Sequence, residues 1–132
     1  MTCEYALIDT HTAVWLYQRK RDKIGGRALA IIEDGKAQLN LPAFVYLELQ
    51  YLYEIERITA TATDIASELA STFGITPTPK SSAGELVTKA LPLAWTRDVF
   101  DRLIAAEVSL TNATLLTKDK SLTNQVPNCV WD

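Results

Sequence analysis

Four short apolar segments, separated by longer stretches with helical character, limit what this chain can fold into more than any other feature. Their lengths and boundaries are typical of buried strands, and they are Glu4–Ile8, Gln38–Leu41, Thr114–Thr117 and Asn128–Trp131. Helices are predicted between them, at His11–Tyr17, Arg27–Asp34, Ala43–Arg57, Asp64–Phe73, Ser81–Ala90 and Asp98–Ser109. Because strands joined through helices pair in parallel, the pattern predicts an α/β fold, with a mostly parallel, twisted sheet between two layers of helices.

The bulk composition restricts the class of protein. A chain of 132 residues predicts one domain, residues 1–132, and 48% hydrophobic with 22% charged residues favours a soluble globular protein. No apolar run is long enough for a membrane span and no signal peptide is evident, while Cys3 and Cys129 favour reduced thiols and a cytoplasmic location. The net charge of −3 argues against a protein that coats nucleic acid, but not against an enzyme that acts on it through bound cations.

Acidic residues stand where the predicted elements meet. Asp9 follows the first strand, Asp119 lies just beyond Thr114–Thr117, and Asp98 and Asp101 open a helix with an apolar continuation. In parallel sheets, ligands bind at the carboxyl ends of the strands, near the point where the strand order reverses. We therefore expect these carboxylates to approach one another, which favours a hard cation such as Mg2+ or Mn2+.

Each of these acids also has a structural interpretation. Asp9 suits the cap of the helix that follows it, and Asp119 suits the cap of a short turn at Lys120–Asn124. Asp98 is four residues before Arg102, a spacing at which the two side chains can pair on one helix. The residue patterns alone leave both interpretations open.

The helix predicted at Ala43–Arg57 contains a further candidate acid, Glu48. An apolar stripe with steps of three and four residues is expected to face the core, and it comprises Phe44, Leu47, Tyr51, Ile55 and Ile58. Glu48 lies along this stripe, where a bare carboxylate would be costly to bury. The pattern therefore indicates that Glu48 is neutralised, hydrogen-bonded or bound to a cation.

The segments YALIDTHTAVW, FVYLELQYL, DVFDRLIAAE and LLTKD resemble, in this order and spacing, the PIN-domain ribonucleases, and they are most similar to the VapC-type toxins of toxin–antitoxin pairs. The resemblance spans nearly the whole chain and implies a PIN-like three-layer α/β/α fold. It also implies an acidic, metal-binding catalytic site made of Asp9, Glu48, Asp101 and Asp119. Thr117 and Asp98 match accessory positions, and Val99 stands where the subgroup often has proline.

The same resemblance implies the reaction and the partners. The expected activity is hydrolysis of RNA phosphodiesters with Mg2+ or Mn2+, and the expected partners are an RNA substrate, a cognate antitoxin and a second copy of the chain in a homodimer. Two other functions compete with this one. One is a non-catalytic PIN-like module that binds RNA or protein, and the other is a Rossmann-like phosphatase with Asp9 as nucleophile. The phosphatase pattern would require a second aspartate where this chain has His11.

Basic residues give weaker signals about RNA binding. The run Arg19–Lys23 is the densest group of cations, and a solvated loop explains it slightly better than a phosphate-steering patch. Arg97, Lys118 and Lys120 lie beside the predicted acids and are better candidates for guiding RNA.

Overall fold

A parallel sheet forms the centre of the protein, which a computed structural model describes for residues 3–78 and 81–132. The five strands pair in the order β3-β2-β1-β4-β5, and every pairing is parallel. They are β1 (Tyr5–Ile8), β2 (Gln38–Leu41), β3 (Thr76–Pro77), β4 (Thr114–Leu116) and β5 (Cys129–Val130). The four predicted strands are thus present, and β3 adds a short fifth strand at the edge of the sheet.

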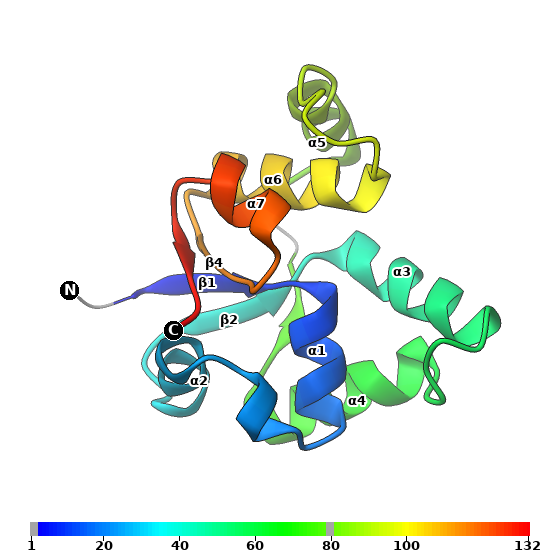
Figure 1. Ribbon diagram of the computed structural model, residues 1–132, viewed down its shortest axis with the longest axis vertical. Coiled ribbons are helices and arrows are strands. Elements are labelled where there is room, and N and C mark those ends of the chain that lie inside the picture. Colours follow the sequence, from blue (N-terminus) through cyan, green and yellow to red (C-terminus); the bar gives the residue numbers. More distant parts are fainter. Residues whose placement is uncertain (1–2, 79–80) are drawn as a thin grey trace.

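Helices cover both faces of this sheet. In Figure 1, α5, α6 and α7 lie above the strands and α1, α2 and α4 lie below them, while α3 extends beyond the ends of the strands. The helices are α1 (Thr10–Tyr17), α2 (Gly26–Glu33), α3 (Ala43–Glu54), α4 (Ala62–Phe73), α5 (Ala83–Ala90), α6 (Val99–Thr111) and α7 (Lys120–Gln125), with a short 3-10 turn, η1, at Arg21–Lys23. The predicted three-layer arrangement is confirmed, and the expected turn after Asp119 is the helix α7.

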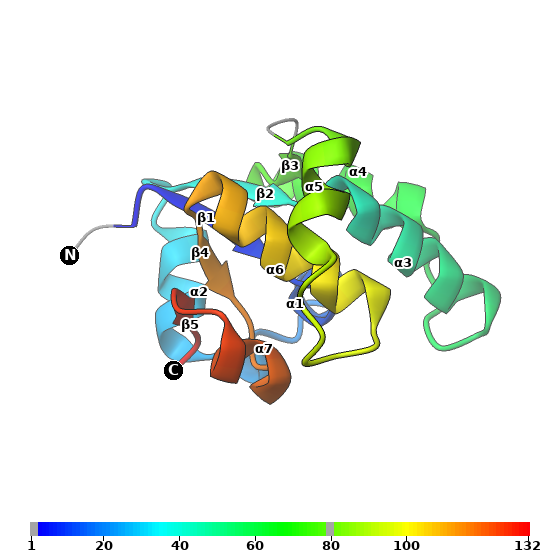
Figure 2. The ribbon, with the colours of Figure 1, turned by 90° about the horizontal axis from the view of Figure 1, so that it is seen from above.

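The strand order reverses beside the first strand. From β1 the chain passes to β2 and β3 on one side and then returns to β4 and β5 on the other side. In the β1–β4 pairing, Ile8 is opposite Leu116, so both strands end at the same level. Helix α6 leads into β4 and runs back along the sheet, which brings its first turn to the carboxyl ends of the strands (Figure 2). Parallel sheets bind ligands at this type of edge.

The face of α3 that enters the core differs from the predicted one. Its fully buried residues are Val45 and Leu49, whereas Leu47, Tyr51 and Ile55 of the predicted stripe are exposed by 68%, 53% and 43%. Val45 and Leu49 are four residues apart and define a face of their own. The stripe prediction was therefore wrong for these three residues, whereas its other two members, Phe44 and Ile58, pack against the core. Helix α3 contacts α1, α4 and α6.

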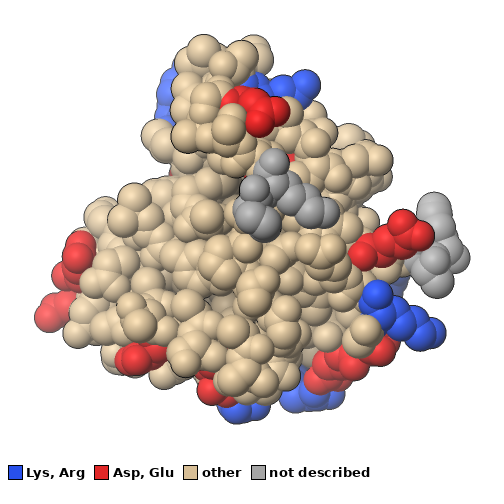
Figure 3. All heavy atoms as spheres, turned by 180° about the vertical axis from the view of Figure 1, so that it is seen from behind, with Lys and Arg blue, Asp and Glu red and all other residues tan. Residues whose placement is uncertain are grey.

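The surface is not uniformly charged. The face turned away from the view of Figure 1 shows few charged side chains at its centre, and Lys, Arg, Asp and Glu lie mainly along its margin (Figure 3). Further large apolar side chains are exposed on or beside α5 and α6, among them Val87, Leu91 and Val99. In the described part of the chain, no helix combines the length and apolar character that crossing a membrane would require.

Candidate active site

Asp9 is the central acid of the site. It follows β1, is only 4% exposed, and its Oδ1 accepts hydrogen bonds from the backbone N–H of Thr12 at 3.0 Å and from the Thr12 hydroxyl at 2.6 Å. Its Oδ2 accepts a hydrogen bond from the hydroxyl of Thr117, at the end of β4. Asp9 thus caps α1, as the structural interpretation predicted, and it also lies at the point where the strand order reverses. A role for Asp9 as a helix cap is therefore compatible with a role in a ligand site.

Asp119 approaches the same place from the loop after β4. Its carboxylate accepts hydrogen bonds from the backbone N–H groups of Ser121 at 2.8 Å and Leu122 at 3.2 Å, so it caps α7. Its own backbone N–H donates to the Thr117 hydroxyl at 3.1 Å. A chain of hydrogen bonds therefore connects Asp119 to Asp9 through Thr117, which is completely buried.

Glu48 reaches the site from α3. One of its carboxylate oxygens accepts a hydrogen bond from the hydroxyl of Thr10, the first residue of α1. Burial raises the pKa of Glu48, the Thr10 hydrogen bond lowers it, and the nearby carboxylates of Asp98 and Asp9 raise it further. Glu48 is therefore a partly buried acid close to two other acids, although it does not lie along a buried stripe as the sequence suggested.

Asp98 and Asp101 begin α6 but differ in their roles. Asp98 caps the helix, because its Oδ1 accepts hydrogen bonds from the N–H groups of Phe100 at 2.9 Å and Asp101 at 3.1 Å. Asp101 is partly buried, and burial together with the charges of Asp98, Asp119, Glu48 and Asp9 raises its pKa to about 7. A carboxyl group whose pKa is raised by four other carboxylates shows that all five acids share one electrostatic environment.

The expected pair of Asp98 with Arg102 is absent from the described structure. The Arg102 guanidinium instead donates to the backbone oxygens of Thr96 at 3.0 Å and Leu91 at 3.4 Å. These carbonyl groups lie in the connection between α5 and α6, and Arg102 holds this connection against the start of α6. The pairing that the sequence left open is therefore not formed, because the local backbone offers acceptors that the sequence does not reveal.

The carboxylates suit a hard divalent cation by their chemistry. Carboxylate oxygens are preferred ligands of Mg2+ and Mn2+, and a cation would relieve the mutual repulsion that raises the pKa of Asp101. Within residues 3–78 and 81–132, however, no three His, Cys, Asp or Glu side chains are close enough together to hold a metal ion as they stand. The acids are neighbours, with Asp9 and Glu48 turned toward hydroxyl groups of the protein.

Comparisons with known proteins decide the family. The sequence matches the PIN domain over residues 6–125. The chain belongs to the PIN-domain family. It is also 31% identical over 133 residues to Ribonuclease VapC22 of Mycobacterium tuberculosis, an alignment that covers 95% of this chain and 97% of that protein.

Solved structures of similar shape support the same fold. A chain of VapBC2 from Rickettsia felis, bound to a DNA fragment from their promoter, matches with a TM-score of 0.63 and 21% identity over 97% of this PIN domain and 99% of that chain. A chain of a toxin–antitoxin complex from Klebsiella pneumoniae matches with a TM-score of 0.63 and 16% identity over 95% of each chain. The expected PIN-like fold is confirmed.

Threonine hydroxyls are the part of this PIN-domain site that the sequence reasoning missed. Thr12 holds one oxygen of Asp9 and Thr10 holds Glu48, and both threonines are buried. Buried hydroxyls normally have a partner, so two threonines at the start of a helix beside an acid could have suggested these contacts. The hydrogen bond from Thr10 on α1 to Glu48 on α3 joins residues far apart in the sequence, so only the folded structure reveals it.

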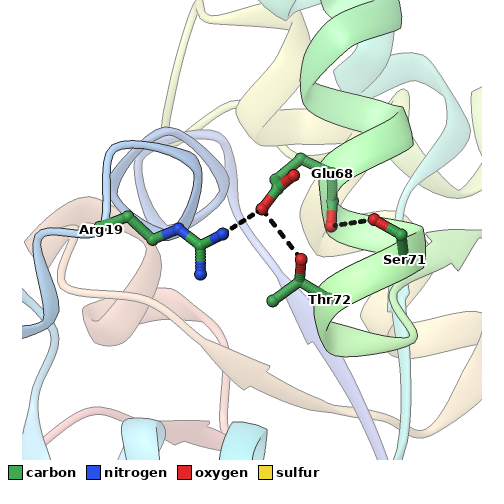
Figure 4. Close-up of polar contacts among 4 residues, drawn as sticks. All are labelled: Arg19, Glu68, Ser71 and Thr72. Carbon is green, nitrogen blue, oxygen red and sulfur yellow. Dashed lines mark hydrogen bonds and ion pairs between the residues drawn. The ribbon is translucent and has the colours of Figure 1, made fainter.

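Part of the basic run of this PIN domain has a structural role. Arg19 forms an ion pair with Glu68 on α4, which also accepts a hydrogen bond from Thr72 at 2.9 Å (Figure 4). Arg21 pairs with Glu33 at the end of α2. These contacts join η1 and the connection after α1 to neighbouring helices, which favours the structural interpretation of both arginines.

The three residues expected to guide RNA differ in their surroundings. Arg97 is exposed and donates to the backbone oxygen of Ala94 at 2.9 Å, within its own loop. Lys118 and Lys120 are exposed on the loop after β4 and at the start of α7, on either side of Asp119. The two lysines therefore remain the better candidates for contacts with RNA.

Proposed function

We propose that this protein is a metal-dependent endoribonuclease that acts as the toxin of a toxin–antitoxin pair. One arrangement carries the proposal: Asp9 and Asp119, linked through Thr117, lie where the strand order reverses. Glu48 is joined to the same helix start through Thr10, and the charges of the surrounding acids help to raise the pKa of Asp101 to about 7. Membership of the PIN-domain family and the similarity to a ribonuclease over nearly the whole length support the same activity.

In this proposal, Asp9, Glu48, Asp101 and Asp119 hold Mg2+ or Mn2+. A bound cation of this type activates a water molecule and neutralises charge on the phosphate. The other residues position the acids: Thr117 and Thr12 fix Asp9, and Thr10 fixes Glu48. Asp98 acts through the helix, because its two hydrogen bonds hold the first turn of α6, from which Asp101 projects.

The proposed partners follow from the relatives and from the surface. One relative with the same fold is part of a toxin–antitoxin complex, and we propose that this chain also binds a cognate antitoxin. The exposed apolar side chains of α3, including Leu47 and Tyr51, suit such a partner or a second copy of the chain in a homodimer. The proposal places the enzyme in the cytoplasm, where its RNA substrate and the antitoxin would meet it.

The competing functions fit the geometry less well. A phosphatase of this type would require a second aspartate, and this chain has His11 at that position. A non-catalytic module has no use for a group of mutually repelling acids, since such a group costs stability. The acids therefore favour catalysis over binding alone.

Cleavage of a labelled RNA tests the proposal directly. The protein with Mn2+ should cleave RNA, EDTA should abolish cleavage, and Asp101→Asn should reduce the rate by about 100-fold or more. Asp64→Asn is a matched control, because Asp64 is likewise the third residue of its helix but is exposed on α4. Full metal-dependent cleavage by the Asp101→Asn variant would refute the assignment.

A further inference from the structure

A second concave site adjoins the acids. It lies between the loop after β4, the N-terminal end of α2 and the C-terminal residues, with Thr117, Gly25 and Trp131 among its lining residues, and its volume is about 590 Å3. In both Figure 1 and Figure 2 the C-terminal segment runs beside α2, which forms one side of this site. We call it the Trp131 hollow. Its size falls within the roughly 300–1,000 Å3 range of sites that hold small molecules.

The Trp131 hollow and the acid site share a wall. Thr117 lines the hollow, and its hydroxyl donates to Asp9. Lys118, the next residue, also lines the hollow, and Asp119 follows it in the acid site. The hollow therefore begins beside the residues that hold Asp9 and Asp119.

The Trp131 hollow contains basic side chains, which the acid site lacks. Its lining includes the lysines Lys23, Lys118 and Lys120 beside the aspartates Asp22 and Asp132. Anionic phosphates next to a group of carboxylates need nearby positive charge, and lysines at the edge of the site supply it. The hollow is thus suited to a phosphate group that is bound beside the acids.

A row of aromatic rings leads from the acids to the hollow. His11 and Trp15 are four residues apart on α1, with ring centroids 5.9 Å apart, and Trp15 lies 6.0 Å from Trp131. His11 is close enough to Glu48 to lower the pKa of that acid, and the Lys118 Nζ lies 5.9 Å from the centre of the Trp15 ring. Aromatic rings next to basic side chains are the usual means of binding single-stranded nucleic acid, because every base can stack on a ring.

The backbone holds Trp131 in a fixed position. The backbone N–H of Ala28 donates to the Trp131 carbonyl at 3.0 Å. A Cβ atom at Gly25 would lie only 2.2 Å from the same oxygen, so the two backbones are in direct contact. A backbone fixed in this way limits where the Trp131 ring can lie, and a surface that is already in place loses less conformational entropy on binding.

We propose that the Trp131 hollow binds the nucleotide next to the cleaved phosphodiester, with its base against Trp131 and its phosphate between Lys118 and Lys120. Trp15 and His11 continue the stacking surface toward the acids. This assignment rests on the proposed function, because it assumes that the acids act on an RNA chain. It adds a binding subsite and the residues that form it.

The test measures RNA binding without cleavage. A fluorescein-labelled single-stranded RNA of about 12 nucleotides, which matches the reach of such sites, is titrated with the full chain in EDTA, and fluorescence anisotropy gives the Kd at several salt concentrations. Lys118→Ala with Lys120→Ala should weaken binding about tenfold and reduce the salt slope by about 0.7, since the neutralisation of one phosphate is lost. The control, Lys36→Ala with Lys89→Ala, removes the same charge from exposed positions outside the hollow and should change little.

A second measurement locates the base without altering a residue that packs against the backbone. RNA containing 4-thiouridine is cross-linked to the wild-type protein by light, and mass spectrometry identifies the attached residues. Cross-links on Trp131 or Trp15 support the proposal. Cross-links confined to other elements, or equal affinities for the two double variants, overturn it.

These outcomes are separate from those that test the nuclease. If Asp101→Asn retains full cleavage, the proposed function fails, whereas the binding data in EDTA still decide whether RNA uses the hollow. If Asp101→Asn abolishes cleavage and Lys118→Ala with Lys120→Ala leaves the Kd unchanged, the nuclease stands and the hollow is excluded.

Discussion

The hydroxyl of Thr117 donates a hydrogen bond to the carboxylate of Asp9 and so connects the ends of two neighbouring strands, β1 and β4. Both residues directly follow the last pair in the register, Ile8 and Leu116. The contact lies where the strand order reverses, and the same hydroxyl accepts the N–H of Asp119 at 3.1 Å. One side chain therefore sets the relative position of two candidate metal ligands.

Replacement of Thr117 by valine should reduce activity, although valine has nearly the same shape as threonine. Thr117→Val keeps the shape but leaves a buried oxygen of Asp9 without its donor, which costs about 1–3 kcal/mol of stability. Loss of a group that orients a metal ligand should lower RNA cleavage by about 10- to 100-fold. Thr117→Ser retains the hydroxyl and should keep most of the activity. Equal cleavage rates for the Val and Ser variants would show that the hydrogen bond does not matter.

The pKa of Asp101 predicts a pH-dependent stability of the metal-free protein. The pKa rises from 3.8 to about 7 on folding, so the folded state holds a proton that the unfolded chain has lost between these values. The stability from this group is complete below pH 3.8 and is lost as the pH rises through about 7. After allowance for solvent screening, the loss is on the order of 1 kcal/mol.

Thermal unfolding in EDTA checks this expectation. At pH 8, Asp101→Asn should raise the Tm by about 3–5 °C relative to the wild type, because it removes the charge, whereas at pH 5 the difference in Tm should be less than about half as large, because the folded wild type still holds the proton. Asp64→Asn, at the corresponding position of α4, provides the control. A Tm difference that is the same at both pH values would contradict the assigned cause.

Metal binding should depend on pH in the opposite direction. A cation that binds Asp101 must displace its proton, so affinity should increase as the pH rises toward and past about 7. Calorimetry with Mn2+ should give a Kd about tenfold lower at pH 8 than at pH 6, with proton release at pH 6. Glu54→Gln should behave as the wild type, because Glu54 is exposed on α3, whereas Glu48→Gln on the same helix should weaken binding. Affinity that does not change with pH would exclude Asp101 as a ligand.

The sequence correctly predicted the strand ends that precede Asp9 and Asp119, because this pattern depends only on residues close together in the chain. A short apolar strand followed by Asp9 and a helix defines both the strand end and the cap, and the same holds for Asp119. The parallel topology then requires both acids to lie at one edge. The residue patterns also singled out Asp101 and Glu48, and the resemblance to the PIN-domain family assigned both of them to one site with Asp9 and Asp119.

The sequence did not show which face of α3 is buried, because two faces of this helix fit the helical pattern equally well. Helix α3 is apolar on most of its surface, so Leu47 and Tyr51 satisfied the helical period as well as Val45 and Leu49 did. Only the packing of α3 against α1, α4 and α6 decides between such faces. The contacts of Arg102 could not be predicted for a similar reason: backbone carbonyl groups, rather than Asp98, accept hydrogen bonds from its guanidinium.

A pair of leucines on α3 tests which face supports the fold. Leu49 is completely buried and Leu47 is 68% exposed, so the same truncation removes very different contacts. Leu49→Ala should cost about 2–5 kcal/mol of unfolding free energy, whereas Leu47→Ala should cost less than about 0.5 kcal/mol. Urea denaturation of both variants gives the values. A large loss of unfolding free energy for Leu47→Ala in the isolated protein would show that the predicted stripe does support the fold.

The two glycines at the start of α2 should respond in opposite ways to the same substitution. Gly25 has an ordinary φ of −58°, but a Cβ atom there would lie 2.2 Å from the Trp131 carbonyl oxygen and 2.8 Å from the Trp131 ring. Gly25→Ala must therefore displace the C-terminal segment, at a cost of about 1–3 kcal/mol. No atom lies within 4 Å of a Cβ atom at Gly26, the first residue of α2, so Gly26→Ala should stabilise the protein by about 0.4–1 kcal/mol. Chemical denaturation followed by tryptophan fluorescence measures both effects, and equal stabilities would show that Trp131 is not held against Gly25.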